Sequence, residues 1–315
     1  MKVLFTGASS FTGYWFVKQL AESGHEVTAL FRRPAAEYTD VRAKRVAALA
    51  ELCKPVYGVS FGTEGFIRLV QQGGFEVLAH HAADVTDYKS PDFKAVDALA
   101  ANTQNIAPVL NAFASAGGRA VVLTGSVFEN DEGAGSGGLP AFSPYGLSKA
   151  LTAQMFRYYA AQAKLALGKF VIPNPFGPFE EPRFTAYLMK NWFAGKIPSV
   201  QTPAYVRDNI HASLLARAYA KFVESMPSTP AFISLNPSGY IESQGAFALR
   251  FANEMRSRLG LECGVELKTQ TNFTEPRIRV NTNPADAMFP DWTESPAWDQ
   301  LAAYYVRLFG NSAGA

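Results

Sequence analysis

The sequence predicts an α/β fold built on a doubly wound parallel sheet, followed by a smaller, mostly helical lobe. Short β-forming runs alternate with helical runs from residue 2 to residue 172, which is typical of parallel strands joined by crossover helices. A glycine-containing turn separates the first strand from the first helix, and small or polar residues follow the fourth and fifth strands. These features together predict a ligand site at the carboxyl ends of the strands.

The periodicity of apolar residues defines the elements in order. Runs rich in β-branched and aromatic residues predict strands, and runs with apolar residues at helical spacing predict helices. The first helix carries Trp15, Phe16, Val17 and Leu20 and ends at Gly24. The other predicted elements of this part are strands at residues 2–6, 27–31, 56–61, 76–83, 119–124 and 170–172, and helices at residues 42–52, 66–72, 102–117 and from Pro144 onward.

The composition restricts the class of protein. With 315 residues, 48% of them hydrophobic, the chain can bury one large core or one core plus a lobe. Its 29 basic and 27 acidic residues form no basic block, so nucleic-acid binding has little support. Cys53 and Cys263 form no CxxC motif, which argues against structural zinc and fits a reducing compartment. No apolar run approaches the ~18 residues that span a bilayer, so we expect a cytoplasmic protein without a membrane segment.

The turn at residues 6–13, Thr-Gly-Ala-Ser-Ser-Phe-Thr-Gly, has the context of a dinucleotide-binding fingerprint. Gly7 permits a sharp turn, Gly13 permits close packing of helix and strand, and the helix N-terminus offers N–H groups to a diphosphate. Ser10 replaces the middle glycine, and its hydroxyl could donate to phosphate. The residues expected to contact the dinucleotide are Gly7, Ser9, Ser10, Phe11, Thr12 and Gly13.

The second predicted strand ends in Arg32 and Arg33, where an NAD-specific site carries an acidic residue. Arginine accommodates the 2′-phosphate of NADP, whereas an acid repels it. The sequence therefore favours NADP over NAD. The alternative is two solvated arginines at a strand end.

His80 and His81 precede Ala82 and Ala83 at the end of the fourth strand. No third metal ligand lies nearby at useful spacing, so we expect hydrogen-bonding histidines and no metal site. The small residues after them would let the backbone pass close to a flat ligand.

Tyr145 and Lys149 lie four residues apart at the start of a helix whose first position is Pro144. A tyrosine side chain normally titrates near ~10, and a cation one turn away lowers its pKa toward the working pH of a general acid/base. Any helix can carry this pair by chance, so its meaning depends on the surrounding motifs.

These motifs occur in a fixed order, and together they resemble the extended short-chain dehydrogenase/reductase superfamily, whose fold is a Rossmann-type sheet. The nearest branch contains the nucleotide-sugar epimerases and dehydratases. The resemblance covers roughly the first 180 residues and the remainder only in outline. It is carried by residues 6–13 and 80–83, Asn102, Thr124, Tyr145 with Lys149, and residues 174–178, Asn-Pro-Phe-Gly-Pro.

The resemblance implies roles by position. Tyr145 would exchange a proton with the substrate oxygen, Lys149 would bind the nicotinamide ribose and lower the pKa of Tyr145, and Thr124 would hydrogen-bond the reacting oxygen. A homodimer through the helices near Asn102 and Tyr145 is also implied. Further implied cofactor residues are Ser60, His81, Ala82, Ala83, Asn102, Pro173 and Phe176, and the substrate-binding candidates are Ser126, Asn174, Arg183, Arg207 and Arg277.

Several departures from the family pattern restrict the activity. Gly125 and Ser126 stand where dehydratases carry an Asp-Glu pair, which disfavours dehydration, and Ser126 cannot act as the catalytic cysteine of some epimerase-reductases. Ser60 replaces a common adenine-binding Asp, and Val171 a common Arg. The segment at residues 200–208 lacks the usual diphosphate-binding residues, so Arg183, Arg207 or Arg277 would have to replace them.

We therefore expect residues 1–177 to bind NAD(P) and residues 178–315 to form the substrate lobe, with residues 205–235 packing back on the first domain. The leading hypothesis is an NADP-dependent oxidoreductase acting on a keto or hydroxyl group of a nucleotide-linked sugar. One alternative is a nucleotide-sugar 4-epimerase with tightly bound NAD. Others are a reductase of a non-nucleotide ketone and a non-catalytic NADP-binding sensor.

Overall fold

The computed structural model describes residues 1–310, and the chain folds into two compact units. The first comprises Met1–Glu132, Leu139–Ile172 and Ala216–Pro237. The second comprises Gly133–Gly138, Pro173–Leu215 and the residues from Ser238 onward.

The first unit is built on a seven-stranded sheet with strand order β11-β7-β5-β4-β1-β2-β3, in which every neighbouring pair is parallel. This confirms the predicted doubly wound α/β fold. The strands are β1 (Lys2–Thr6), β2 (Glu26–Phe31), β3 (Lys54–Tyr57), β4 (Val77–His80), β5 (Ala120–Ser126), β7 (Ala166–Ile172) and β11 (Phe232–Leu235).

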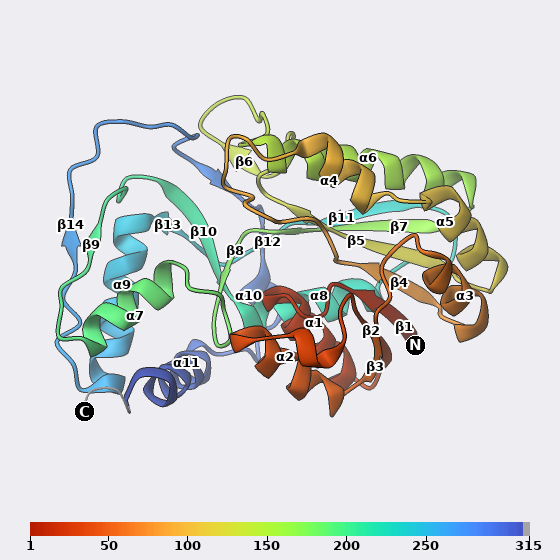
Figure 1. Cartoon of the computed structure of the whole chain (residues 1–315). Coiled ribbons are helices and arrows are strands. Elements are labelled where there is room, and N and C mark those ends of the chain that lie inside the picture. Colours follow the sequence, from red (N-terminus) through yellow and green to blue (C-terminus); the bar gives the residue numbers. More distant parts are fainter. Residues whose placement is uncertain (311–315) are drawn as a thin grey trace. The chain divides into compact units, whose positions relative to one another are not determined.

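Helices cover both faces of this sheet (Figure 1). On one face, Phe113 and Phe156 belong to a buried core formed with the strands. On the other, Phe16 of the first helix stacks on Tyr219 with ring centroids 4.0 Å apart. The first face carries α3 (Glu64–Gly73), α4 (Ala95–Asn102), α5 (Ile106–Ser115) and α6 (Pro144–Gln162); the second carries α1 (Phe11–Glu22), α2 (Asp40–Ala50) and the part of α8 (Ala212–Glu224) that lies in this unit.

The second unit packs short strands and helices around an aromatic core. Trp298 is stacked on Phe176 within this core, with centroids 5.3 Å apart. Strand β10 pairs with β8 in parallel and with β13 antiparallel. The elements are β6 (Ala134–Gly135), β8 (Asn174–Phe176), α7 (Phe184–Phe193), β9 (Ser199–Val200), β10 (Val206–His211), β12 (Pro237–Ser238), β13 (Tyr240–Ser243), α9 (Gln244–Leu259), β14 (Glu266–Leu267), β15 (Arg279–Val280), β16 (Asn283–Pro284), α10 (Ala285–Met288) and α11 (Glu294–Phe309).

Two predicted helix starts are wrong. Asn102 ends α4 instead of starting the next helix, because the chain reverses through Asn105, which has a φ of 50°. From the sequence, Asp208 is also predicted to cap a helix from Asn209 to about Phe222. Instead it lies within β10, and its carboxylate accepts hydrogen bonds from the amides of Gly239 and Asn281. Helix α8 starts only at Ala212.

The third strand is shorter than predicted, because Gly58 turns the chain with a φ of 71°. Among residues 1–310, no helix is both long and apolar enough to cross a membrane.

Candidate active site

The turn between β1 and α1 is shaped by two glycines that no other residue could replace. Gly7 has a φ of 79°, and a Cβ atom there would lie 2.8 Å from the amide nitrogen of Ala82. A Cβ atom on Gly13 would lie 2.3 Å from the carbonyl oxygen of Gly7. The turn leads directly into the N-terminus of a 12-residue helix, and the N–H groups of a helix N-terminus suit the diphosphate of a dinucleotide. The turn therefore fits the group that the sequence predicts.

The hydroxyl of Ser10 is used within the turn. It donates to the carbonyl oxygen of Gly7 over 2.9 Å and caps α1 by accepting from the amide of Gly13 over 3.0 Å. The hydroxyl that the sequence suggests for phosphate thus stabilises the turn, and the backbone amides remain for the ligand.

Arg45 also supports this turn, a role that was not predicted from the sequence. This arginine on α2 is completely buried, and its Nη1 atom donates to the carbonyl oxygen of Ser9 over 2.8 Å. In the sequence Arg45 resembles a solvated residue of a charged helix, and only its position next to Val46, on the buried side of α2, could have indicated otherwise. Arg45 thus connects α2 to the turn.

Arg32 and Arg33 follow directly after β2 and are exposed. The amide of Arg33 donates to the Tyr38 hydroxyl over 3.3 Å. Within residues 1–310, neither guanidinium forms a hydrogen bond or ion pair, so both charges are available to an anionic ligand.

Ser60, Ala82 and Asn102 lie in the first unit near the ends of the strands. The carbonyl of Ser60 accepts from the Thr63 hydroxyl over 2.8 Å, which positions the loop after β3. The amide of Ala82 donates to the hydroxyl of Thr6 over 3.0 Å. Asn102 is buried and accepts from the amide of Asp84 over 2.9 Å. These contacts order the segment after β4, which continues through Ala83.

The two histidines at the end of β4 form hydrogen bonds, as the sequence predicts. His80 lies 3.1 Å from the hydroxyl of Thr6, and His81 contacts the hydroxyls of Ser10, Thr12 and Thr124. Burial, reinforced by the charge of Lys149, lowers the pKa of each ring to about 3. Both rings are therefore neutral near pH 7. Among residues 1–310, no cluster of histidine, cysteine, aspartate and glutamate could hold a metal ion.

Tyr145 and Lys149 lie one turn apart in the first half of α6. Ser143 caps this helix by accepting from the amide of Gly146 over 3.4 Å, and Pro144 occupies its first turn. Lys149 is buried, and its Nζ atom donates to the carbonyl oxygen of Thr124 over 2.6 Å. Burial lowers the pKa of Lys149, which the charge of Glu129 opposes.

Two aromatic residues after β4 contact the ring of Tyr145. Tyr88 and Phe93 meet it edge-on, with centroids 5.5 and 5.8 Å away. Neither was predicted from the sequence, because their segment has no periodic pattern. These two contacts hold the ring of the half-buried Tyr145.

The end of β5 places the hydroxyls of Thr124 and Ser126 in different surroundings. The Thr124 hydroxyl lies 2.9 Å from His81 Nδ1. The Ser126 hydroxyl accepts from the amide of Phe128 over 3.3 Å, and the Ser126 amide donates to the buried carboxylate of Glu129 over 2.7 Å. Both hydroxyls are buried and partly used by the protein itself.

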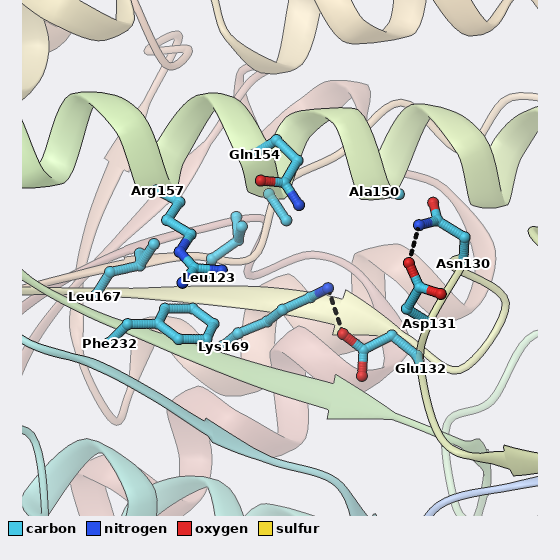
Figure 2. A pocket seen from close by; sticks show the side chains of 11 residues that line it. Leu123, Asn130, Asp131, Glu132, Ala150, Gln154, Arg157, Leu167, Lys169 and Phe232 are labelled. Atoms are coloured by element: carbon cyan, nitrogen blue, oxygen red, sulfur yellow. Dashed lines mark hydrogen bonds and ion pairs between the residues drawn. The ribbon is translucent and has the colours of Figure 1, made fainter. Parts of the chain in front are cut away.

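A buried lysine neutralises that carboxylate. Lys169 on β7 lies 2.5 Å from both Glu129 and Glu132, and Figure 2 shows its contact with Glu132. The two carboxylates raise the pKa of Lys169 against the opposing effect of burial. Lys169 also lines a pocket of about 280 Å³ between α6 and the strands β7 and β11, where Arg157 lies over the ring of Phe232 (Figure 2). None of the predicted site residues lines this pocket.

The remaining predicted residues belong to the second unit. Asn174 starts β8 directly after Pro173 and donates to the carbonyl of Asp208 over 3.3 Å. Phe176 is buried in the aromatic core of this unit. Arg183 precedes α7 and is exposed.

The guanidinium groups of Arg207 and Arg277 differ in their accessibility to a ligand. Arg207 is buried, and its guanidinium donates to the carbonyls of Val206 and Pro276 and to the carboxylate of Glu275 over 2.8–3.0 Å. Arg277 is exposed, and its guanidinium lies over the ring of Phe273 at 4.5 Å. Arg277 is therefore the more accessible cation.

Comparison with known families and structures agrees with this fold. The model of the NAD dependent epimerase/dehydratase family matches residues 3–233. The chain belongs to this family and is an enzyme of the extended short-chain dehydrogenase/reductase type. No curated protein matches the sequence.

Several solved structures share the fold at low sequence identity. A mutant of the UDP-glucuronic acid 4-epimerase of Bacillus cereus, in complex with a fluorinated UDP-sugar and NAD, is 17% identical over 98% of this chain and 100% of that chain, with a TM-score of 0.75. The UDP-glucose 4-epimerase of Thermotoga maritima, with UDP-glucose, is 16% identical over 98% and 99%, with a TM-score of 0.74. The dTDP-glucose 4,6-dehydratase of Streptomyces venezuelae, with NAD and TYD, is 18% identical over 98% and 98%, with a TM-score of 0.71.

Proposed function

We propose that this enzyme is an NADP-dependent oxidoreductase that interconverts a ketone and a secondary alcohol on a nucleotide-linked sugar. The observation that carries the chemistry is the Tyr145–Lys149 pair on α6, with the Lys149 ammonium fixed to the end of β5. The dinucleotide, when bound, supplies or takes up the hydride. Tyr145 exchanges a proton with the reacting oxygen, Lys149 favours its phenolate and binds the ribose, and Thr124 helps to position the oxygen.

The two exposed arginines after β2 support NADP as the dinucleotide. Arg32 and Arg33 have no carboxylate partner among residues 1–310, and the acid that binds the NAD ribose is missing. Two arginines without an ionic partner attract the 2′-phosphate of NADP, which an acidic residue at this place would repel. The adenine side is expected to contact the loop that contains Ser60.

The proposal of a nucleotide-sugar substrate is supported by the family and by the ligands of the similar structures, which include UDP-sugars. Within the second unit, Arg277 is the best candidate for the substrate diphosphate. The guanidinium of Arg207 is already bound by carbonyls and by Glu275, whereas Arg277 is exposed and held flat by Phe273. Arg183, Asn174 and Ser126 remain candidates for contacts to the sugar.

A 4-epimerase with tightly bound NAD is the second candidate. The same Tyr145 and Lys149 would serve it, and similar structures include 4-epimerases with NAD. In that case the dinucleotide would stay bound through many turnovers, and Arg32 and Arg33 would be solvated residues without a ligand.

One experiment separates these two candidates. The protein is purified without added cofactor and denatured, any released nucleotide is identified, and thermal shifts are measured with NADPH and NADH. Protein free of nucleotide and stabilised selectively by NADPH supports the oxidoreductase. NAD(H) retained at about one per chain would instead establish the epimerase.

A separate measurement tests the substrate class. UDP, CDP and GDP are added at millimolar concentration, and a rise in melting temperature with one of them supports a nucleotide sugar. If none has an effect, a non-nucleotide ketone becomes the better substrate. A non-catalytic NADP sensor would bind NADPH and turn over no ketone, although Tyr145 and Lys149 are both retained.

We also propose a cytoplasmic homodimer. Apolar side chains are exposed on α6 and α4, including Leu147, Leu151 and Tyr158 and, at 77% exposed, Val96. Their exposure supports a dimer interface on α4 and α6. From the sequence, the interface is expected on α6 and on the helix that follows Asn102, which is α5. Sedimentation of Leu151→Glu as a monomer, against a wild-type dimer, would support this interface.

A further inference from the structure

Two consecutive histidines at the end of β4 place their rings on opposite faces of the sheet. The His80 ring stacks on Phe156 of α6, with centroids 4.9 Å apart, and lies near the hydroxyl of Thr6. The His81 ring meets Phe16 of α1, with centroids 5.3 Å apart. Both rings have a pKa lowered to about 3 but contact different partners, which allows His80 to serve as a control for His81.

His81 connects two segments that are far apart in the sequence. Its Nε2 atom lies 3.0 Å from Ser10 Oγ and 3.1 Å from Thr12 Oγ1, and its Nδ1 atom lies 2.9 Å from Thr124 Oγ1. Ser10 and Thr12 belong to the turn that suits a diphosphate, whereas Thr124 lies near the end of β5. One imidazole therefore bridges the dinucleotide turn and the strand expected to face the substrate.

The positions of the protons follow from counting donors and acceptors. The Ser10 hydroxyl donates to the Gly7 carbonyl and accepts from the Gly13 amide, so toward His81 it can only accept. This assigns the ring proton to Nε2, which two hydroxyl oxygens can share, and leaves a lone pair on Nδ1. In the opposite tautomer only Thr12 could donate to Nε2, and the lone pairs of Ser10 Oγ and His81 Nε2 would face each other at 3.0 Å. The hydroxyl of Thr124 is then the donor to Nδ1.

We propose that His81 is a positioning residue that holds the hydroxyl proton of Thr124, so that Thr124 presents an oxygen lone pair, and not a proton, to a bound substrate. Where it concerns substrate and dinucleotide, this inference rests on the proposed function. A substrate alcohol can donate to that lone pair, whereas a substrate ketone cannot. Tyr145 is thereby left as the group that donates a proton to the ketone oxygen.

The bridge also couples the two segments energetically. Removing the imidazole leaves the buried hydroxyl of Thr124 without its acceptor, which is costly. The half-buried hydroxyl of Ser10 keeps its bonds to Gly7 and Gly13 but loses its connection to β5. Removing the imidazole of His81 or the hydroxyl of Thr124 should therefore loosen the dinucleotide turn, although Thr124 lies on a different strand from that turn.

The tautomer is measured directly by nitrogen NMR of protein labelled with ¹⁵N-histidine, without cofactor or substrate. The chain has 4 histidines, and the His81 resonances are those lost in His81→Leu. We expect a protonated Nε2 and an unprotonated Nδ1 at neutral pH. Thr124→Val should move the Nδ1 resonance, and Thr124→Ser, which keeps the hydroxyl, should restore it. A protonated Nδ1, or no response to Thr124→Val, overturns the proposal.

A double-mutant cycle measures the coupling. His81→Leu and Thr124→Val should each weaken NADPH binding on the order of two- to tenfold, and the double variant should bind no more weakly than His81→Leu alone. The control cycle pairs His80→Leu with Thr124→Val and should be additive. Additive effects in the His81 cycle, for both NADPH binding and unfolding by urea, would contradict the coupling.

The proposed function and the role of His81 can fail separately. If the wild-type protein binds neither NADPH nor NADH, the proposed function is wrong, while the NMR and the unfolding cycle still decide the role of His81. If NADPH binds but Thr124→Val lowers kcat without changing NADPH affinity or the His81 resonances, Thr124 acts as a proton donor to the substrate and the proposal is wrong.

Discussion

The ammonium of Lys149 donates a hydrogen bond to the backbone carbonyl of Thr124 over a distance of 2.6 Å. This contact joins the start of α6 to the end of β5, and it fixes the only charged group of the Tyr145–Lys149 pair inside the protein. Burial lowers the pKa of Lys149, and the nearby carboxylate of Glu129 partly compensates. The cation that should tune Tyr145 is thus held by backbone geometry.

Replacing Lys149 by methionine should slow turnover and move its pH optimum upward. Without the cation, the pKa of Tyr145 returns toward its ordinary value, so less phenolate is present at neutral pH. We expect kcat at pH 7 to fall on the order of 100-fold or more. The measurement is the pH dependence of kcat, with the exposed Lys196→Met as control. An unchanged pH profile with reduced kcat would show that Lys149 acts only through ribose binding.

Replacing Tyr145 by phenylalanine should abolish turnover and leave NADPH affinity nearly unchanged. The ring keeps its contacts with Tyr88 and Phe93, so only the proton-exchanging group is lost. A loss in kcat of at least ~100-fold is expected. Steady-state kinetics and fluorescence titration of NADPH measure the two quantities. Tyr158→Phe, an exposed position on the same helix, serves as control. Full activity of Tyr145→Phe would disprove the proposed chemistry.

Replacing Arg32 by alanine should weaken NADPH much more than NADH. A charge-assisted contact to the 2′-phosphate is worth about 1.5–3 kcal/mol, roughly a 10- to 150-fold change in the dissociation constant. The matched control is Arg68→Ala, an exposed arginine paired with Glu64. Equal effects of Arg32→Ala on the two dinucleotides would show that Arg32 is a surface residue without a role in cofactor choice.

Much of the first unit could be predicted because its signals are local. The strand at Lys2–Thr6 and the helix start at Pro144 are as predicted, since period and flanking residues define both. Strand β10 was mistaken for helix because its pairing partners, β8 and β13, are distant in the sequence. Periodicity within one segment contains no information about such partners.

The same limit applies to the candidate site. The sequence indicates Tyr145 and Lys149 through their spacing, but Arg45 and the bridge through His81 depend on contacts between separate elements. A histidine beside an alanine gives no sign that it will join Ser10 to Thr124. Such contacts become visible only when the sheet order is known.

Removing Lys169 should destabilise the first unit strongly. Lys169→Met would leave the fully buried carboxylate of Glu129 without its cation, and breaking a buried pair in this way costs about 3–5 kcal/mol. The double variant Lys169→Met/Glu129→Gln should recover much of this loss, because the fully buried charge is removed. The carboxylate of Glu132 loses the lysine but still accepts from the side-chain amide of Asn236. Urea unfolding measures the change, with Lys268→Met, from an exposed pair, as control. Equal losses in the single and double variants would show that packing, and not charge, is responsible.

The free energy of unfolding of the second unit should fall as the pH rises, because of the buried carboxyl of Glu180. Glu180 is buried and accepts hydrogen bonds from the hydroxyls of Thr185 and Tyr305. Desolvation raises its pKa from 4.5 to about 7, and these hydrogen bonds and the charge of Arg183 only partly oppose this. As the pH rises above 4.5, the carboxyl ionises first in the unfolded chain. The stability present below 4.5 is thus lost progressively up to about pH 7 and is constant above it.

The loss is on the order of 3 kcal/mol at most. It should appear as the difference in free energy of unfolding between wild type and Glu180→Gln, measured in urea from pH 5 to pH 8. Other carboxylates contribute equally to both proteins and cancel in this difference. Exposed Glu262→Gln should show no such change with pH, because its carboxylate is solvated in both states. If Glu180→Gln and wild type have parallel pH profiles, the Glu180 carboxyl ionises in the folded protein near its ordinary pKa, and its burial does not determine the pH dependence.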